Sequence, residues 1–213
     1  MSDHELAARL AAEAGELLLG IRVELAETTA QERKDAGDKR SHDFLMAALG
    51  VERPNDVVLS EEGADNRARL TADRVWIVDP LDGTREFGEL GREDWAVHVA
   101  LWEKGELVAG AVALPAQGET LATPDVPLPA AHDGPPRVIV SRTRPPAIAL
   151  AVRDALDGVL VEMGSAGAKV SAVVQGIADI YVHAGGQYEW NRPRRSPWRA
   201  PRGCSPHAST ARR

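Results

Sequence analysis

The 213-residue sequence has few of the features that mark membrane, secreted or disulfide-bonded proteins. It contains one cysteine, Cys204, so no disulfide can form within the chain, which favours a reducing compartment. No apolar run approaches the length that a membrane span needs. The first thirty residues carry several Asp and Glu and lack the apolar stretch of a secretory signal. We therefore expect a cytoplasmic protein with no membrane partner.

Patterns that would indicate several other chemistries are also missing. The sequence has no His/Cys cluster with zinc-ligand spacing and no glycine-rich string for a nucleotide or dinucleotide. Residues 191–213 hold seven Arg and no acidic residue, which leaves 18 basic against 32 acidic residues elsewhere, a net charge of −14. An acidic body argues against a nucleic-acid polymer as partner, and it would repel phosphate esters unless cations reversed the local sign.

The most informative stretch runs from Val75 to Phe87. Its apolar first part predicts a buried strand, which breaks at Asp79-Pro80 before Asp82-Gly83 turns the chain. Two carboxylates and the intervening Leu81 carbonyl would then stand on fixed backbone, the donor set that hard divalent cations prefer. The alternative interpretation is a strand followed by an ordinary Asp-Gly turn, because that dipeptide by itself usually marks a turn.

An upstream segment repeats this plan. The apolar run that ends at Leu59 is followed by Ser60, Glu61 and Glu62, so it predicts a second strand with carboxylates at its end. If the two strands are neighbours, Glu61, Asp79 and Asp82 converge. Three carboxylates at one place cannot all be ionised unless cations neutralise them. The two segments together predict a divalent-metal site.

The same strings carry a resemblance to a known family. Asp-Pro-Leu-Asp-Gly-Thr at 79–84, preceded by Leu-Ser-Glu-Glu at 59–62, resembles the motif of the Mg²⁺-dependent, Li⁺-sensitive phosphatases of the inositol monophosphatase family. The resemblance covers about residues 5–190. The strings Arg-Glu-Phe at 85–87, Asp-Trp-Ala-Val-His at 94–98, Gly-Ser-Ala-Gly-Ala-Lys at 164–169 and His-Ala-Gly-Gly-Gln-Tyr-Glu-Trp at 183–190 are similar to the CysQ-type 3′(2′),5′-bisphosphate nucleotidase branch.

The resemblance implies a mechanism and a set of roles. Two or three Mg²⁺ ions would be held by Glu61, Asp79, the Leu81 carbonyl and Asp82, and would activate a water for in-line attack on a phosphomonoester. Thr84 with Asp38, and Glu61, would act on that water. Asp38 can instead simply cap a helix. The predicted substrate is 3′-phosphoadenosine 5′-phosphate; the alternatives are inositol-1-phosphate or another sugar phosphate, and an inactive remnant.

The expected phosphate contacts come from two turns. Backbone N–H groups of Gly83 and Thr84 would hold phosphate oxygens, with Arg85 as a second anion contact or a surface arginine. Gly164 and Ser165 open a predicted helix whose N–H groups can hold phosphate, although such a turn more often only permits close packing. Lys169, one helical turn further on, could face the 5′-phosphate of a nucleotide.

Periodicity predicts an α+β architecture. We expect helices at 3–21, around 44–49, at 146–157 and from 164 to 176, a hairpin of 95–102 with 106–114, and strands at 119–123, 137–141, 159–163 and 178–184. Residues 24–40 are polar and predict a surface loop in which Asp38 caps the helix that follows. The resemblance implies a layered α-β-α-β-α sandwich whose C-terminal part is truncated. The predicted divisions are 1–115, a Pro-rich connector at 116–136, an incomplete half at 137–190 and a tail at 191–213.

The tail does not continue the pattern. At Asn191 the chain becomes rich in Arg and Pro, where members of the family continue Asp-Ser-Ala-Ala-Pro and an Ala-rich helix. We interpret this as a one-base frameshift near codon 191, the alternative being a genuine divergent basic tail. Sequencing the coding DNA across codons 188–194 separates the two. We expect residues 191–213 to be disordered and to contribute no site residue, and the family resemblance makes a homodimer possible.

Overall fold

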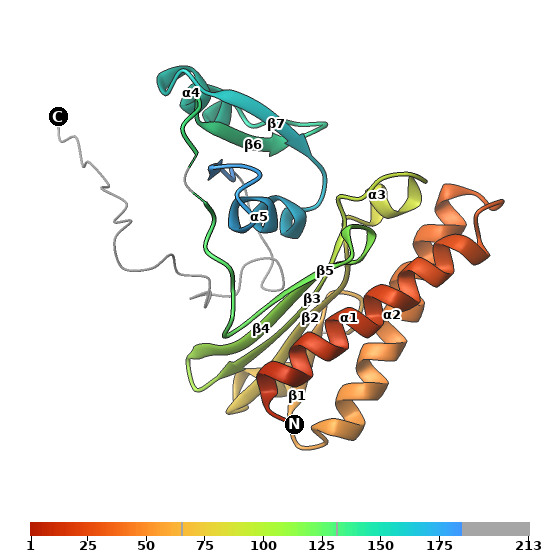
Figure 1. Ribbon diagram of the computed structural model, residues 1–213. Helices are drawn as coiled ribbons and strands as arrows, with labels where there is room; N and C mark the ends of the chain where they lie inside the picture. Colours follow the sequence, from red (N-terminus) through yellow and green to blue (C-terminus); the bar gives the residue numbers. More distant parts are fainter. Residues whose placement is uncertain (65, 131, 185–213) are drawn as a thin grey trace.

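The computed structural model describes residues 1–64, 66–130 and 132–184 (Figure 1). Its α-helices are α1 (Asp3–Glu24), α2 (Ala30–Glu52), α3 (Thr84–Gly88), α4 (Ala147–Ala155) and α5 (Ala166–Val174). Its strands are β1 (Val57–Ser60), β2 (Arg74–Asp82), β3 (Ala96–Glu103), β4 (Glu106–Leu114), β5 (Glu119–Ala122), β6 (Arg137–Ser141), β7 (Val159–Met163) and β8 (Ile180–Tyr181). Short 3₁₀ helices occur at Arg67–Leu70 and Pro115–Gln117. Our predictions for the tail and for Asn191 lie outside the described residues.

The first sheet has the strand order β1-β2-β3-β4-β5. β1 runs parallel to β2 with Ser60 opposite Val78, whereas the remaining pairs are antiparallel. Parallel strands end at the same edge of a sheet, so the residues that follow β1 lie beside Asp79. The predicted hairpin is confirmed, and so is the neighbourhood of the two strands that carry the acidic motifs.

Helices α1 and α2 cover one face of this sheet (Figure 1). On α1 the residues predicted from their spacing of three and four are buried against alternate residues of β2, β3 and β4. This spacing places them on one stripe of the helix, because an α-helix repeats every 3.6 residues. A capping box of Ser2 with Glu5 begins the helix. The resulting cluster is the main hydrophobic core, which anchors the strands that carry the site.

Helix α2 corrects the predicted loop at 24–40. The helix begins after Thr29, which forms a capping box with Glu32, so Asp38 lies inside the helix and does not cap it. Its buried positions recur every four residues, at Arg33, Gly37, Ser41, Leu45 and Leu49. Three of these five are small or charged, so the helical period is invisible to a search for apolar residues. Gly37 is required by contact, since a Cβ there would stand 2.6 Å from the Phe87 ring.

The second sheet has the parallel order β7-β6-β8 and lies between two helices. One face, with Val138 and Val140, packs on α4, and the opposite face, with Ile139, packs on α5. The other side of α5 contacts the first sheet through Ala168, which packs near Ala96. The layers are therefore α1/α2, first sheet, α5, second sheet and α4, which confirms the predicted α-β-α-β-α sandwich.

The predicted connector at 116–136 contains β5, which confirms the strand predicted at 119–123. Residues 123–130 and 132–136 of this range have no helix or strand. β8 spans two residues of the predicted strand 178–184. In the part of the chain that the structure describes, each helix is too short or too polar to cross a membrane.

Candidate functional site

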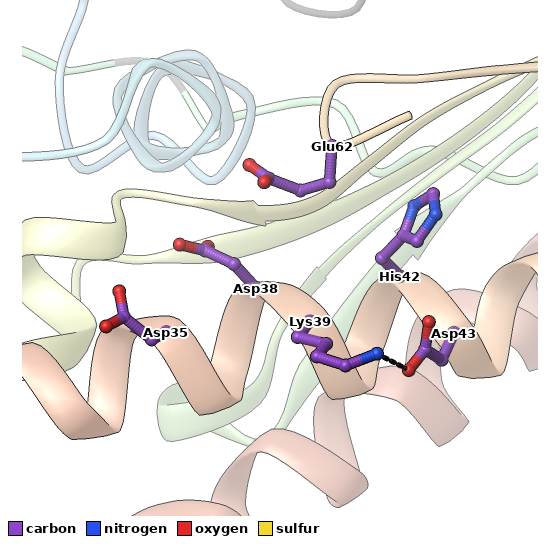
Figure 2. A pocket seen from close by; sticks show the side chains of 6 residues that line it. All are labelled: Asp35, Asp38, Lys39, His42, Asp43 and Glu62. Atoms are coloured by element: carbon purple, nitrogen blue, oxygen red, sulfur yellow. Dashed lines mark hydrogen bonds and ion pairs between the residues drawn. The ribbon is translucent and has the colours of Figure 1, made fainter. Parts of the chain in front are cut away.

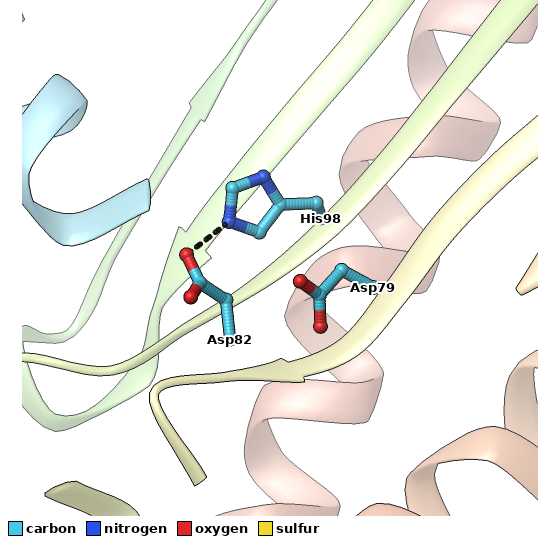
Figure 3. A group of neighbouring side chains, drawn as sticks. All are labelled: Asp79, Asp82 and His98. Atoms are coloured by element: carbon cyan, nitrogen blue, oxygen red, sulfur yellow. Dashed lines mark hydrogen bonds and ion pairs between the residues drawn. The ribbon is translucent and has the colours of Figure 1, made fainter. Parts of the chain in front are cut away.

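The acidic residues of the two motifs meet where β1 and β2 end. Asp79 and Asp82 belong to β2, and the antiparallel register with β3 places His98 opposite Asp79. One ligand atom from each of these three residues lies within 4.8 Å of the others (Figure 3). The register of β2 shifts between Asp79 and Asp82, so the chain bulges and turns both carboxylates toward the same space. Two carboxylates that share one space in this way are suited to a cation.

Asp79 is a buried carboxyl with other carboxyls close to it. Its side chain is 1 % exposed, and its Oδ1 accepts a hydrogen bond of 3.2 Å from the Leu81 N–H. Burial, together with the nearby carboxyls of Asp82 and Glu61, raises the pKa of Asp79 well above its ordinary value. Glu61 therefore reaches the site from the end of β1, as the parallel pairing requires. A bound cation would relieve this repulsion, so the residues fit a metal ion.

Asp82, three residues further on, is held quite differently. Its carboxylate accepts hydrogen bonds from Ser165 Oγ at 2.8 Å, from the Ala166 N–H at 3.3 Å, from the Gly167 N–H and from His98 Nε2 at 3.1 Å. Burial opposes ionisation of this carboxyl, but the hydrogen bonds outweigh it and lower the pKa of Asp82 to about 2. Asp82 is thus an ionised carboxylate in contact with the first turn of α5.

Thr84 links the motif to α2. Its hydroxyl lies 3.1 Å from the Leu81 carbonyl oxygen and 3.3 Å from Asp38 Oδ1, so the predicted reach between Thr84 and Asp38 is present. Burial and the neighbouring Glu62 carboxylate raise the pKa of Asp38 to about 7, against the opposing effect of the Thr84 hydrogen bond. The wrong expectation concerned only the secondary structure around Asp38, since α2 brings the side chain to the motif.

A cleft of about 370 Å³ opens beside Asp38. It is lined by Asp35, Asp38, Lys39, His42, Asp43 and Glu62, as Figure 2 shows. Lys39 is paired with Asp43 at 2.6 Å, so its charge is directed to that carboxylate. His42 Nδ1 lies 2.8 Å from Ser60 Oγ, the residue before Glu61. Four carboxylates thus line an open cleft at the end of β1.

The glycine of the motif has both a conformational and a steric reason. Gly83 has φ of 91°, in the left-handed region, and it precedes the short helix α3. A Cβ at this position would stand 2.8 Å from the Ser165 Cβ, so the turn also permits close approach of the second half.

Arg85, predicted as an anion contact, is half-exposed and pairs with Glu89 at 3.3 Å.

The predicted phosphate turn at 164–167 is bound to carboxylates of the first half. The Gly164 N–H donates to Asp94, and the Ala166 and Gly167 N–H groups donate to Asp82, while Ser165 Oγ caps α5 by accepting from the Ala168 N–H at 2.9 Å. Lys169 is buried, and its Nζ donates to the carbonyls of Gly164 and Ser165. Burial lowers the pKa of Lys169, against the nearby carboxylates of Asp82, Glu86 and Asp94.

Two residues at the site were not anticipated. His98 alternates with Val97 and Val99 on β3, a pattern that is typical of an ordinary residue of a sheet. Its contact with Asp82 depends on the strand register, which the local sequence does not specify. Asp94 begins the string at 94–98 that carries part of the family resemblance but had no assigned role; it is buried and accepts hydrogen bonds from Arg92 and from the Gly164 N–H.

Comparison with known proteins defines first the fold class. The extragenic suppressor protein SuhB of Bartonella henselae matches with a TM-score of 0.70 and 21% identity over 88% of this chain and 79% of that one, a likeness of fold. CysQ of Bacteroides thetaiotaomicron, a bacterial member of the inositol monophosphatase family, matches with a TM-score of 0.68 and 25% identity over 87% of this chain and 81% of that one. The architecture is that of the inositol monophosphatases.

Sequence comparison gives the family itself. The model of the inositol monophosphatase family matches residues 3–192, and the chain belongs to this family of phosphoric monoester hydrolases. Among curated proteins, the 3′-phosphoadenosine 5′-phosphate phosphatase of Mycobacterium leprae is 49% identical over 204 residues, which cover 90% of this chain and 75% of that protein. The resemblance drawn from the motifs is therefore confirmed.

Proposed function

We propose that this chain is a Mg²⁺-dependent phosphomonoesterase that hydrolyses 3′-phosphoadenosine 5′-phosphate to AMP and phosphate. The observation that carries the proposal is the 49% identity with a phosphatase named for this substrate. The convergent carboxylates at Asp79 and Asp82, which fit a cation, support the metal-dependent part. The inositol-1-phosphate alternative is kept as an outcome of the assay, because the motif contacts only the metals and the transferred phosphate.

We propose that Mg²⁺, in two or three ions, is held by Glu61, Asp79, the Leu81 carbonyl and Asp82. These are oxygen donors on backbone fixed by a sheet, the kind of site that Mg²⁺ accepts. When bound, the ions lower the pKa of a water and stabilise the attacking and leaving oxygens of an in-line displacement. The raised pKa of Asp79 supports this assignment, because the site is repulsive until positive charge enters it.

The protein's own groups would act on the water and the phosphate. Thr84 Oγ1 lies between the Leu81 carbonyl and the Asp38 carboxylate, so Thr84 and Asp38 together can orient an attacking water, with Glu61 on the β1 side. The N–H groups of Gly83 and Thr84, at the first turn of α3, are the proposed contacts for phosphate oxygens. Arg85 is the proposed outer anion contact once it leaves Glu89.

Substrate recognition would involve the first turn of α5. We propose Gly164 and Ser165 as contacts for the nucleotide and Lys169 as the partner of its 5′-phosphate. Lys169 Nζ is now bound to two backbone carbonyls, so this role requires the side chain to exchange those bonds for phosphate oxygens. Such an exchange is favourable, because a charge-assisted bond from an ammonium to a phosphate is stronger than one to a neutral carbonyl.

One assay tests the proposal. Phosphate release is measured from 3′-phosphoadenosine 5′-phosphate and from inositol-1-phosphate, with Mg²⁺, with EDTA and with Li⁺ added to Mg²⁺. We expect rapid release from the nucleotide, slow release from the inositol ester, and loss of both with EDTA or Li⁺. Equal rates would refute the nucleotide preference. No release by protein with a cooperative melting transition would favour an inactive remnant, and activity that survives EDTA would refute the metal dependence.

We propose further that the protein works in the cytoplasm as a homodimer, on a small phosphorylated substrate and with no nucleic-acid polymer or membrane as partner. The single cysteine, the acidic composition of residues 1–190 and the absence of a membrane-crossing helix in residues 1–64, 66–130 and 132–184 support this. Light scattering during size-exclusion chromatography tests the dimer, and a mass of one chain at micromolar concentration would contradict it.

A further inference from the structure

The Asp82 carboxylate accepts hydrogen bonds from two parts of the fold, the N-terminus of α5 and strand β3. From α5, Ser165 Oγ and the Gly167 N–H donate to it, and from β3 the imidazole of His98 donates through Nε2 at 3.1 Å. Figure 3 shows the imidazole directed at the carboxylate of Asp82, with Asp79 beside these two side chains. The His98 side chain thus contacts Asp82 from the first sheet.

The proton position follows from the partner. The oxygen that His98 Nε2 faces, Asp82 Oδ2, also accepts hydrogen bonds from Ser165 Oγ and the Gly167 N–H, so it acts as an acceptor and the nitrogen that faces it carries the hydrogen. The His98 side chain is 16 % exposed, and a polar side chain at that burial is costly unless it is paired. Packing alone would favour an apolar residue here, as at Ala96, which lies two residues away on the same face of β3. The imidazole therefore has a use beyond filling space.

The first turn of α5 packs closely against the His98 imidazole. A Cβ placed on Gly167 would overlap His98 Nε2 and would stand 2.8 Å from Asp82 Oδ2. Only glycine lets the helix terminus approach closely enough for its N–H to reach the carboxylate. Asp82, His98 and the first turn of α5 form one packed unit, and removing the imidazole donor releases one side of the carboxylate.

We propose that His98 is a positioning residue for the phosphatase reaction, which holds the Asp82 carboxylate in the orientation that faces Asp79 and a bound Mg²⁺. This inference rests on the proposed function. Hydrogen bonds to a ligating group orient it, and removing such a bond costs about 10- to 100-fold in metal affinity or activity. Because His98 acts through Asp82, its loss weakens metal occupancy and leaves the chemistry of the loaded site intact.

The test compares two substitutions of similar size. H98Q keeps an N–H that reaches Asp82, whereas H98M keeps the volume and loses the donor. Isothermal calorimetry measures Mg²⁺ binding and a melting curve measures folding, with H132Q, which changes an exposed histidine, as the matched control. We expect H98M to bind Mg²⁺ about tenfold or more weakly and H98Q and H132Q to bind like the parent. H98N, which is too short to reach Asp82, replaces H98M if that variant loses its melting transition.

Kinetics provide a second readout. The apparent KM for Mg²⁺ should rise in H98M, while kcat returns close to the parent value at saturating Mg²⁺. Parental Mg²⁺ affinity in H98M would overturn the proposal, and so would equal losses in H98M and H98Q, or a loss of kcat that Mg²⁺ does not restore. Because calorimetry needs no substrate, it remains decisive even if the protein fails to hydrolyse the nucleotide.

Discussion

The carboxyl groups on the two sides of the site, the side toward α2 and the side toward α5, have pKa shifts in opposite directions. On the α2 side, burial and the neighbouring Glu62 carboxylate raise the pKa of Asp38, and burial with the nearby Asp82 and Glu61 raises that of Asp79. On the α5 side, the pKa of Asp82 falls to about 2 although it too is buried. Asp79 and Asp82 share residue type and burial, so the difference between these two comes from their partners.

Those partners have a structural origin. The α5 side supplies an imidazole and the N–H groups at a helix N-terminus, where the helix dipole also favours negative charge. The α2 side presents a helix flank bearing further carboxylates, and its Lys39 is paired with Asp43. Hydrogen bonds thus lower the pKa of Asp82, whereas burial and neighbouring carboxyls raise the pKa values of Asp38 and Asp79. Four predictions test whether the two sides differ in this way.

The largest effect should come from Asp79→Asn. Removing this ligand should lower kcat/KM about a thousandfold or more, equivalent to ~4 kcal/mol of transition-state stabilisation. The same change removes a buried, repelled carboxyl, so the metal-free protein should melt at a higher temperature than the parent. Steady-state kinetics and melting in EDTA measure both. A lower melting temperature would show that Asp79 is already compensated.

Magnesium should stabilise the folded protein through the α2 side. A ligand at a hundred times its Kd contributes about 2.7 kcal/mol, which for a chain of this size raises Tm by roughly 5–10 °C. Melting curves with Mg²⁺ and with EDTA measure the shift. In Asp79→Asn the shift should vanish, and a shift that persisted there would place the ion elsewhere.

Asp82→Asn should destabilise the metal-free protein, opposite in sign to Asp79→Asn. The amide cannot match an ionised acceptor for the donors of His98, Ser165 and Gly167, and hydrogen bonds to a charged group contribute about 1.5–3 kcal/mol each. We expect a loss of about 2 kcal/mol in urea unfolding in EDTA. Ser165→Ala, which removes one of those donors, is the control and should lose less. Stability equal to the parent would contradict the picture of the α5 side.

The smallest effect concerns pH. The folded-state pKa of Asp38, about 7, exceeds its ordinary value of 3.8, so the folded state binds the proton more tightly. The free energy of unfolding of the metal-free protein should therefore fall as pH rises from about 4 through 7. Because Asp38 is partly exposed, we expect only ~1 kcal/mol, or about 3 °C in Tm. Asp38→Asn should flatten that fall, and an unchanged slope would exclude Asp38 as its source.

The sequence predictions were right where an apolar pattern reports burial and wrong where the buried residues are not apolar. The strands were predictable because alternating or continuous apolar residues report burial, and the family motif placed Asp79, Asp82 and Thr84 in one string. Helix α2 was missed because its buried face uses Arg33, Gly37 and Ser41, which pack on the β2–α3 turn without being apolar. The capping box of Thr29 with Glu32 was the available signal.

The sequence alone determined the layered α+β class, the family and the carboxylates that attract a cation, since all three depend on local strings and their period. Only the tertiary structure decided that Asp79 and Asp82, three residues apart, have opposite pKa shifts. That outcome depends on His98 from a neighbouring strand and on the first turn of α5, which lies more than eighty residues further along the chain. Charge compensation acts through space over a few ångströms, and distance along the chain does not report it.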